Sequence, residues 1–200
     1  MRGNRAQLRL MGSAIAAIAI MASGCTTEPT AEGKEKALES QFAELLKRPD
    51  IESAAKRHEE ILTKIRDKLV AAGFTAAWRE AEDSSSVSGC QSGFSDTWSE
   101  IDSDTAEIRA LAQWISSGNL PDGKWEQAVK VVEEVAREHG FDGPAVVVDR
   151  PGDHEVSFKD GYGAHLQFGT VQNTVLSLTT GCHLTVAAHQ RGTPTSKRTY

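Results

Sequence analysis

The chain has 200 residues, of which 39% are hydrophobic, and its 22 basic and 28 acidic side chains give a formal net charge of −6. This composition is typical of a folded globular protein and argues against a disordered chain. Because an acidic protein repels phosphate backbones, the charge also argues against nucleic acid as a partner.

The chain begins with a basic segment followed by an apolar one. The basic residues are Arg2, Arg5 and Arg9, and the apolar segment runs from Leu10 to about Met21. This order is typical of an export signal, and roughly a dozen apolar residues are too few for a transmembrane helix, which needs about 20. We therefore predict that residues 1–24 are a cleaved signal peptide. Removing its three arginines from the 22 basic residues leaves 19 against 28 acidic ones, a net charge near −9.

The signal ends in "ASGC", residues 22–25, which resembles the lipobox of bacterial lipoproteins. Such boxes more often carry leucine where this chain has Ala22. The resemblance implies that the sulfur of Cys25 receives a diacylglyceryl group and that the protein is lipid-anchored on the extracytoplasmic side of the cell membrane. The membrane is therefore one expected partner. An ordinary secretory signal followed by an unrelated cysteine is the alternative.

The mature chain divides into three parts. Residues 25–36 are small and polar and are expected to form a flexible tether. Residues 37–188 are expected to form a single globular domain, and residues 189–200 a flexible tail.

Two helices are predicted at the start of the domain. Apolar side chains spaced for one helix face run from Leu38 to Leu46, and Pro49 ends that segment. Asp50 can cap a second helix, in which apolar residues recur at alternating steps of three and four until Gly73.

The middle of the domain is less regular. Residues 75–87 lose the helical period and are predicted to form a strand that leads into a serine-rich turn. Asp104 and Glu107 match a capping box, and apolar residues at helical spacing follow as far as Gly118. The sequence therefore predicts a helix over residues 104–118.

The rest of the domain predicts one more helix and then a sheet. Apolar residues at helical spacing run from Trp125 to Ala136, and Gly140 ends the segment. Four short runs with strand character follow, separated by turn residues: 145–149, 156–158, 166–168 and 176–178. If the last strand continues unbroken, Cys182 points into the core. We expect an α+β fold, a single domain with helices packed on one face of a mostly antiparallel sheet.

Two cysteines, Cys90 and Cys182, remain after Cys25. In an exported chain two such thiols most often form a disulfide, which by the loop-entropy argument would stabilise this fold by roughly 4 kcal/mol. A redox pair and a metal site are the alternatives. Redox cysteines usually lie close together in sequence, and a zinc site needs more ligands than His183, which alone lies beside either sulfur.

The histidines offer a competing hypothesis about function. His58 lies on an apolar helix face and is expected to be packed, whereas His165 and His183 occupy polar positions of their strands and can face solvent together. An envelope hydrolase or metal-binding protein could use this pair with nearby carboxylates. No H-x-x-x-H or C-x-x-C spacing supports a metal, and no G-x-S-x-G motif is present, so we expect no catalytic residue, no metal and no cofactor.

The tryptophans leave two roles open. They could line a pocket for an apolar ligand or fill the space between helices and sheet, and filling is the preferred interpretation for all four: Trp78, Trp98, Trp114 and Trp125. The leading hypothesis is a non-enzymatic binding or interaction module of the cell envelope. Its partner would be an unidentified envelope protein or an apolar ligand.

Three segments together carry a family resemblance: "ASGC", "SGCQSGF" around Cys90, and "SLTTGCHL" around Cys182. With these, the chain resembles the LppA/LppV family of mycobacterial lipoproteins over nearly all of its mature length. The resemblance implies a cell-envelope lipoprotein that is lipidated at Cys25 and pairs Cys90 with Cys182. It supplies no active site.

Overall fold

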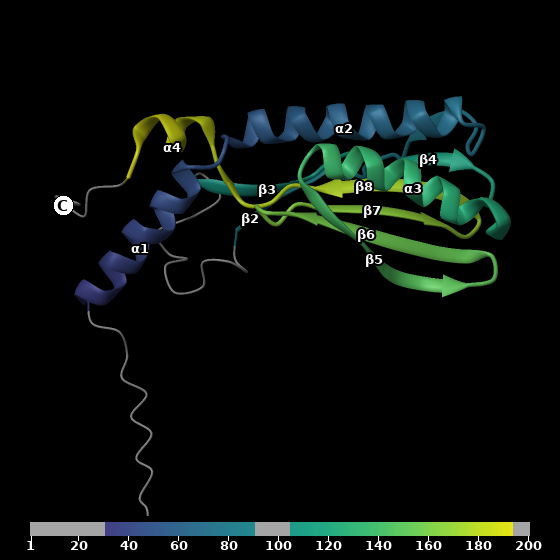
Figure 1. Cartoon of the computed structure of the whole chain (residues 1–200). Coiled ribbons are helices and arrows are strands. Elements are labelled where there is room, and N and C mark those ends of the chain that lie inside the picture. Colours follow the sequence, from purple (N-terminus) through teal and green to yellow (C-terminus); the bar gives the residue numbers. More distant parts are fainter. Residues whose placement is uncertain (1–30, 91–104, 194–200) are drawn as a thin grey trace, which may run out of the picture.

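The computed structural model describes residues 31–90 and 105–193 (Figure 1). Within these ranges the helices are α1 (Ala31–Leu46), α2 (Ile51–Ala71), α3 (Asp122–Glu138) and α4 (Val186–Arg191). The helices α2 and α3 lie side by side on one face of a sheet, whereas α1 and α4 lie together at one end of it (Figure 1).

Nine strands form one sheet in the described part of the chain. They are β1 (Trp78–Glu80), β2 (Ser86–Gly89), β3 (Ala106–Ala110), β4 (Trp114–Ser117), β5 (Phe141–Arg150), β6 (Asp153–Asp160), β7 (His165–Thr170), β8 (Asn173–Thr179) and β9 (His183–Leu184). The strand order is β1-β4-β8-β7-β6-β5, and β3 pairs with β2, β8 and β9. All of these pairs are antiparallel, so the predicted α+β class is confirmed.

The strands β5 to β8 form the predicted antiparallel meander. Val156 lies opposite Phe168, and Phe168 lies opposite Leu176, so these side chains share one face of the sheet. Residues of this parity in β7 and β8 are buried, and those of the other parity are half-buried. The alternation of burial follows the strand period of two, which is why the sequence could predict these strands.

The main core lies between this face and the helices α2 and α3. Trp125 of α3 stacks on Phe168 of β7, with ring centroids 5.1 Å apart. The buried apolar side chains of α2 and α3 complete the core: Ile61, Leu62, Ile65, Leu69, Val132 and Val135. Asp50 caps α2 as expected, since its carboxylate accepts a hydrogen bond of 3.0 Å from the backbone N–H of Ser53.

The helix predicted over residues 104–118 is wrong, because this segment forms the strands β3 and β4. The two strands are separated by an interruption at residues 111–113, and an interruption resets the alternation of faces along a strand. Ile108 in β3 and Leu111 in the interruption then fall at a spacing of three that imitates a helix. The β-branched Ile108 and Ile115 suit the strands.

A matching interruption separates β1 from β2, the strands that pair with β4 and β3. Residues 81–85 lie opposite residues 111–113, so five residues of one strand face three of the other. Ser84 satisfies the backbone at this bulge: its hydroxyl donates to the Ala81 carbonyl at 2.8 Å and accepts from the Gln113 N–H at 2.9 Å. The sequence predicted a strand and a serine-rich turn here, and the structure adds a second strand after the turn.

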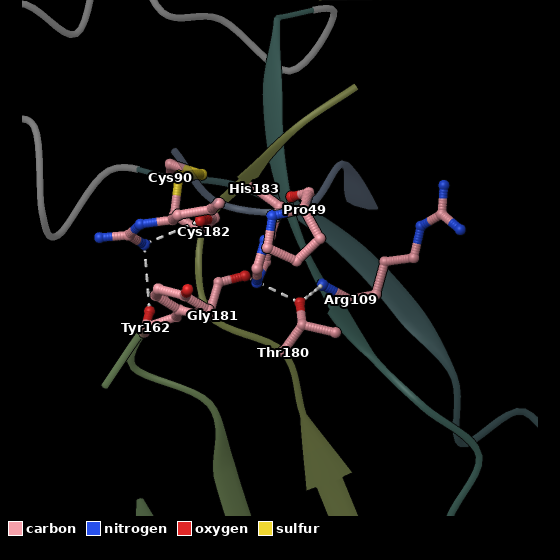
Figure 2. Close-up of a disulfide and its surroundings, with 9 residues drawn as sticks. Pro49, Cys90, Arg109, Tyr162, Thr180, Gly181, Cys182 and His183 are labelled. Atoms are coloured by element: carbon pink, nitrogen blue, oxygen red, sulfur yellow. Dashed lines mark hydrogen bonds between the residues drawn. A yellow bond between two sulfur atoms is a disulfide. The ribbon is translucent and has the colours of Figure 1, made fainter. Parts of the chain in front are cut away.

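A second, smaller core lies at the end of the sheet where α1 and α4 pack. Cys90 and Cys182 form a disulfide in it, with Cα atoms 5.5 Å apart and a sequence separation of 92 (Figure 2). The guanidinium of Arg48 donates hydrogen bonds to the carbonyls of Cys182 at 2.9 Å and Tyr162 at 3.1 Å. The apolar partners come from α1, β3, β9 and α4: Phe42, Leu45, Ala106, Leu184 and Ala188. The disulfide therefore joins the end of β2 to the segment between β8 and β9.

Both ends of the described chain are more helical than predicted. The helix α1 begins at Ala31, inside the range 25–36 assigned to a tether, and α4 extends to Arg191, inside the range 189–200 assigned to a tail. Thr185 caps α4, because its hydroxyl accepts a hydrogen bond from the N–H of Ala188 at 3.2 Å. Residues 25–30 and 194–200 lie outside the described residues.

Replacing Gly181 with alanine is predicted to destabilise the fold. A Cβ at this position would lie 2.0 Å from the carbonyl oxygen of Tyr162, a backbone atom that cannot rotate away. We expect Gly181→Ala to lower the free energy of unfolding by about 2 kcal/mol or more, measured by urea denaturation. Gly123→Ala in α3 is the matched control: nothing lies within 4 Å of a Cβ there, and alanine favours a helix. Wild-type stability in Gly181→Ala would contradict this close approach.

Candidate functional site

A groove of about 660 Å³ lies beside α2, over the interrupted strands. The helix α3 packs on β5 and β6, while α2 packs on β3 and β8. The helix α2 forms one side of the groove. Residues of the strands β1 to β4, and of the segments between these strands, form its floor. We call this the α2 groove, and its lining residues are Ala55, Glu59, Leu62, Thr63, Arg66, Glu80, Ser85, Ser86, Val87, Arg109, Ala110, Leu111, Ala112 and Trp114.

Small side chains give the α2 groove its depth. Ala110 and Ala112 flank Leu111 where β3 gives way to β4, and an alanine fills little of the space above a strand. Of the apolar lining residues, Leu62 and Leu111 belong to the buried main core, while Val87 is 60% exposed. The groove therefore combines an apolar floor with an open mouth.

Three contacts hold the guanidinium of Arg66 in the groove. Its guanidinium lies over the ring of Trp114, 3.4 Å from the ring centroid. Its Nε donates to the Leu62 carbonyl at 3.2 Å, and one terminal nitrogen donates to the Thr63 hydroxyl at 2.9 Å. Burial lowers the pKa of Arg66, and the nearby carboxylates of Asp67 and Glu80 offset this in part.

The second arginine of the groove is neutralised. Arg109 donates to the carboxylates of Glu52 at 2.6 Å and Glu107 at 2.7 Å, and these hydrogen bonds raise its pKa. In the part of the chain that the structure describes, Arg66 forms no ion pair within 4.0 Å. Glu59 and Glu80 line the same groove and are exposed.

Two buried histidines lie outside the groove. His58 of α2 is 4% exposed, and its Nε2 lies 3.9 Å from a carboxylate oxygen of Asp160. Burial lowers the pKa of His58 to about 4, against a weaker opposing effect of Asp160. The packed position predicted for His58 is confirmed. Asp160 itself accepts hydrogen bonds from the backbone N–H groups of Tyr162 and Ala164.

The prediction that His183 faces solvent with His165 is wrong. His183 is 1% exposed, its Nδ1 is hydrogen bonded to the Pro49 carbonyl at 2.9 Å, and the Tyr162 ring meets it edge-on (Figure 2). Pro49 and Tyr162 cover the side of β9 that an isolated strand would expose. Burial lowers the pKa of His183.

His165 has different surroundings, since it lies in β7 opposite Lys159 and Thr179 and is half-buried. Among residues 31–90 and 105–193, no group of three His, Cys, Asp or Glu side chains could hold a metal ion.

His154 of β6 contacts side chains of both α3 and β5. Its ring stacks on Trp125, with centroids 5.2 Å apart, and its nitrogens lie 2.9 Å from Asp149 and 3.2 Å from Asp122. Gly152 also donates its backbone N–H to Asp122, and these contacts lower the pKa of the Asp122 carboxyl. The first turn of α3 is thereby joined to the turn between β5 and β6.

The remaining predicted residues divide between the described and the undescribed parts of the chain. Cys25 and Trp98 lie outside the described residues. Trp125 is buried, and Trp78 and Trp114 pack partly buried against the main core, although Trp114 also lines the α2 groove. As for membrane segments, none of the helices in the described ranges combines the length and the apolar character needed to span a bilayer.

This geometry is that of an α+β domain with an internal disulfide, a class typical of proteins that fold in oxidising compartments. Residues 26–186 match the family "LppA: Lipoprotein confined to pathogenic Mycobacterium", and the chain belongs to this family. The resemblance seen in the sequence is therefore confirmed.

Two solved structures match the chain in a structural comparison. The crystal structure of the lipoprotein LppA from Mycobacterium tuberculosis is 13% identical, with a TM-score of 0.61 over 79% of this chain and 90% of that one. A DUF4853 family protein from Actinomyces odontolyticus is 15% identical, with a TM-score of 0.47 over 75% of this chain and 72% of that one. No curated protein matches the chain.

The groove and its arginine have no clear signal in the amino-acid sequence. Arg66 occupies a polar position of an amphipathic helix, where an arginine usually faces solvent, and Trp114 was assigned to a helix that does not form. One signal was present, because Trp114 is followed by Ile115 within a segment whose β-branched residues favour strands. The pairing with Arg66 joins positions 48 residues apart and leaves no local pattern.

The buried His58 predicts a loss of stability in mild acid. Its pKa is about 4 in the folded state, against an ordinary value of 6.5, so between these pH values the unfolded chain binds a proton that the folded chain lacks. This contribution to stability is complete above pH 6.5 and is lost as the pH falls toward 4, by roughly 3 kcal/mol in total. Urea denaturation of wild type and His58→Phe across this range measures it.

The variant should lack this part of the pH dependence, because phenylalanine cannot titrate. Above pH 7.5 the two proteins should give parallel stability profiles, since the histidine is neutral there in both states. Parallel profiles between pH 7 and pH 4 as well would show that His58 is not the titrating group.

Proposed function

We propose that this protein is a lipoprotein of the cell envelope, anchored through a lipid on Cys25, and that its folded domain is a non-enzymatic binding module. The family and the segment "ASGC" support the anchor. The α2 groove supports the binding role and is the observation on which that part of the proposal depends.

A lipid on Cys25 would hold the protein firmly at the membrane. A diacylglyceryl group brings two acyl chains, and each buried methylene contributes about 0.8 kcal/mol, so two chains hold a protein firmly where one does not. Residues 26–30 separate Cys25 from the start of α1. Five residues span at most about 18 Å when extended, so the lipid would keep the domain close to the membrane surface.

The binding role follows from what lines the groove. The α2 groove joins apolar side chains to Arg66, a cation that forms no ion pair with the described residues, and apolar lining with a few placed polar groups is typical of ligand sites. None of the six histidines of the chain is among its lining residues. The hypothesis of a hydrolase or metal protein built on His165 and His183 has lost its support, because His183 is buried and hydrogen bonded to Pro49.

Replacing Cys25 tests the anchor. In a bacterial host that lipidates its lipoproteins, the wild-type chain should carry the mass of the acyl chains and sediment with membranes. Cys25→Ser should lack that mass, because serine offers no thiolate for the thioether. Thr26→Ser is the matched control and should remain lipidated. An unacylated wild-type chain would refute the anchor.

Filling the groove tests the binding role. Ala112→Trp places a large side chain on the groove floor, whereas Ala187→Trp places the same side chain on the exposed surface of α4. Native mass spectrometry of the full lipoprotein, purified from its host, should detect a bound small molecule in wild type and Ala187→Trp but not in Ala112→Trp. Identical spectra for all three proteins would contradict a ligand in the groove.

A further inference from the structure

The guanidinium of Arg66 is held in place before any ligand arrives. Trp114 supports one face of its plane, and the Leu62 carbonyl and the Thr63 hydroxyl fix its Nε and one terminal nitrogen. The other terminal nitrogen forms no hydrogen bond with the described residues. A planar cation fixed in this way loses little conformational entropy when it binds a planar anion.

The charge of Arg66 is only partly compensated. Burial lowers the pKa of Arg66, which means that the groove disfavours its charged form relative to water. Arg109, in the same groove, has two carboxylates in contact, whereas Arg66 has none within ion-pair distance in the described part of the chain. A carboxylate that bound Arg66 through two N–H···O bonds would compensate this charge.

The remaining charges restrict the ligand. Glu59 and Glu80 are exposed and line the groove beside Arg66, so they repel a ligand that carries several negative charges. Arg109 cannot attract such a ligand either, because Glu52 and Glu107 neutralise it. A single negative charge is therefore favoured over a phosphate or a polyanion.

The floor of the groove specifies the rest of the ligand. Apolar side chains make up half of the lining, and among them Val87 is 60% exposed and Trp114 lies against Arg66, while Ala110 leaves room above the strands. An apolar body lying on this floor would be removed from water at about 25 cal/mol per Å² of buried surface. The groove thus joins an apolar surface to one fixed cation.

We propose that the α2 groove binds a monocarboxylate with an apolar body, with its carboxylate on the guanidinium of Arg66. This inference rests on the proposed binding function and names the ligand class for it. A fatty acid and the free C-terminus of an apolar peptide share this chemistry.

The test compares each acid with its uncharged counterpart. The full lipoprotein on nanodiscs, with empty nanodiscs as reference, is titrated calorimetrically with dodecanoate and its methyl ester, and with N-acetyl-leucyl-leucine and its amide. For at least one pair the acid should bind at least about tenfold more tightly than its counterpart. The pair that responds identifies the source of the carboxylate as lipid or peptide.

Variants then assign the preference to Arg66. Arg66→Gln should abolish it, and Arg66→Lys should reduce it, because lysine keeps the charge but loses the planar fork. The matched control is Arg79→Gln on the neighbouring strand β1, which does not line the groove and should keep the full preference. Circular dichroism confirms that each variant is folded.

The proposal is overturned if neither acid binds, if acids and counterparts bind equally, or if folded Arg66→Gln keeps the preference. In each case the binding module itself would survive if Ala112→Trp still removed a bound molecule in native mass spectra. Failure of the ligand class and failure of the proposed function are therefore separate results.

Discussion

The hydroxyls of Ser84 and Thr180 satisfy the backbone where the paired strands are interrupted. Ser84 bridges Ala81 and Gln113, and Thr180 accepts from the N–H of Arg109 at 2.9 Å, as Figure 2 shows. These bonds give backbone groups at the interruptions the partners that a regular ladder would otherwise supply. The α2 groove lies over the interruption at residues 81–85 and 111–113, and the disulfide joins the end of β2 to the segment between β8 and β9. Ser84 thus supports the strands beneath the groove, and Thr180 supports the segment that leads to Cys182.

The charged groups of this domain fall into two classes by the cause of their pKa shifts. Arg109 donates hydrogen bonds to two carboxylates and Asp122 accepts them from Gly152 and His154, so their charged forms are favoured and each joins neighbouring elements. Arg66 and His58 are shifted the other way, mainly by loss of solvent. His58 is enclosed in the core, where its Nδ1 has no hydrogen-bond partner among the described residues, whereas Arg66 lines a groove that a ligand could reach. The two pKa values shift in the same direction, but only Arg66 is accessible.

The sequence predicted those parts of the fold that local periodicity determines. The helices α2 and α3 and the meander β5–β8 each have a regular apolar spacing, and Cys90 and Cys182 were the natural pair in an exported chain. Strands β3 and β4 were missed because the interruption at residues 111–113 breaks the period of two. His183 was misplaced because its cover comes from Pro49 and Tyr162, which are distant in sequence. The groove unites side chains from Ala55 to Trp114 and depends on tertiary contacts that no local pattern encodes.

The helices α1 and α4 both pack on β9, so the described chain starts and stops at the same end of the domain (Figure 1). The turns after β5 and β7 lie at the opposite end, where Val171 is largely exposed. With the lipid proposed on Cys25, the start of α1 would lie nearest the point of attachment, and the turn around Gly152, between β5 and β6, would lie at the opposite end of the domain. An antibody directed at that turn would therefore bind on the side away from the attachment.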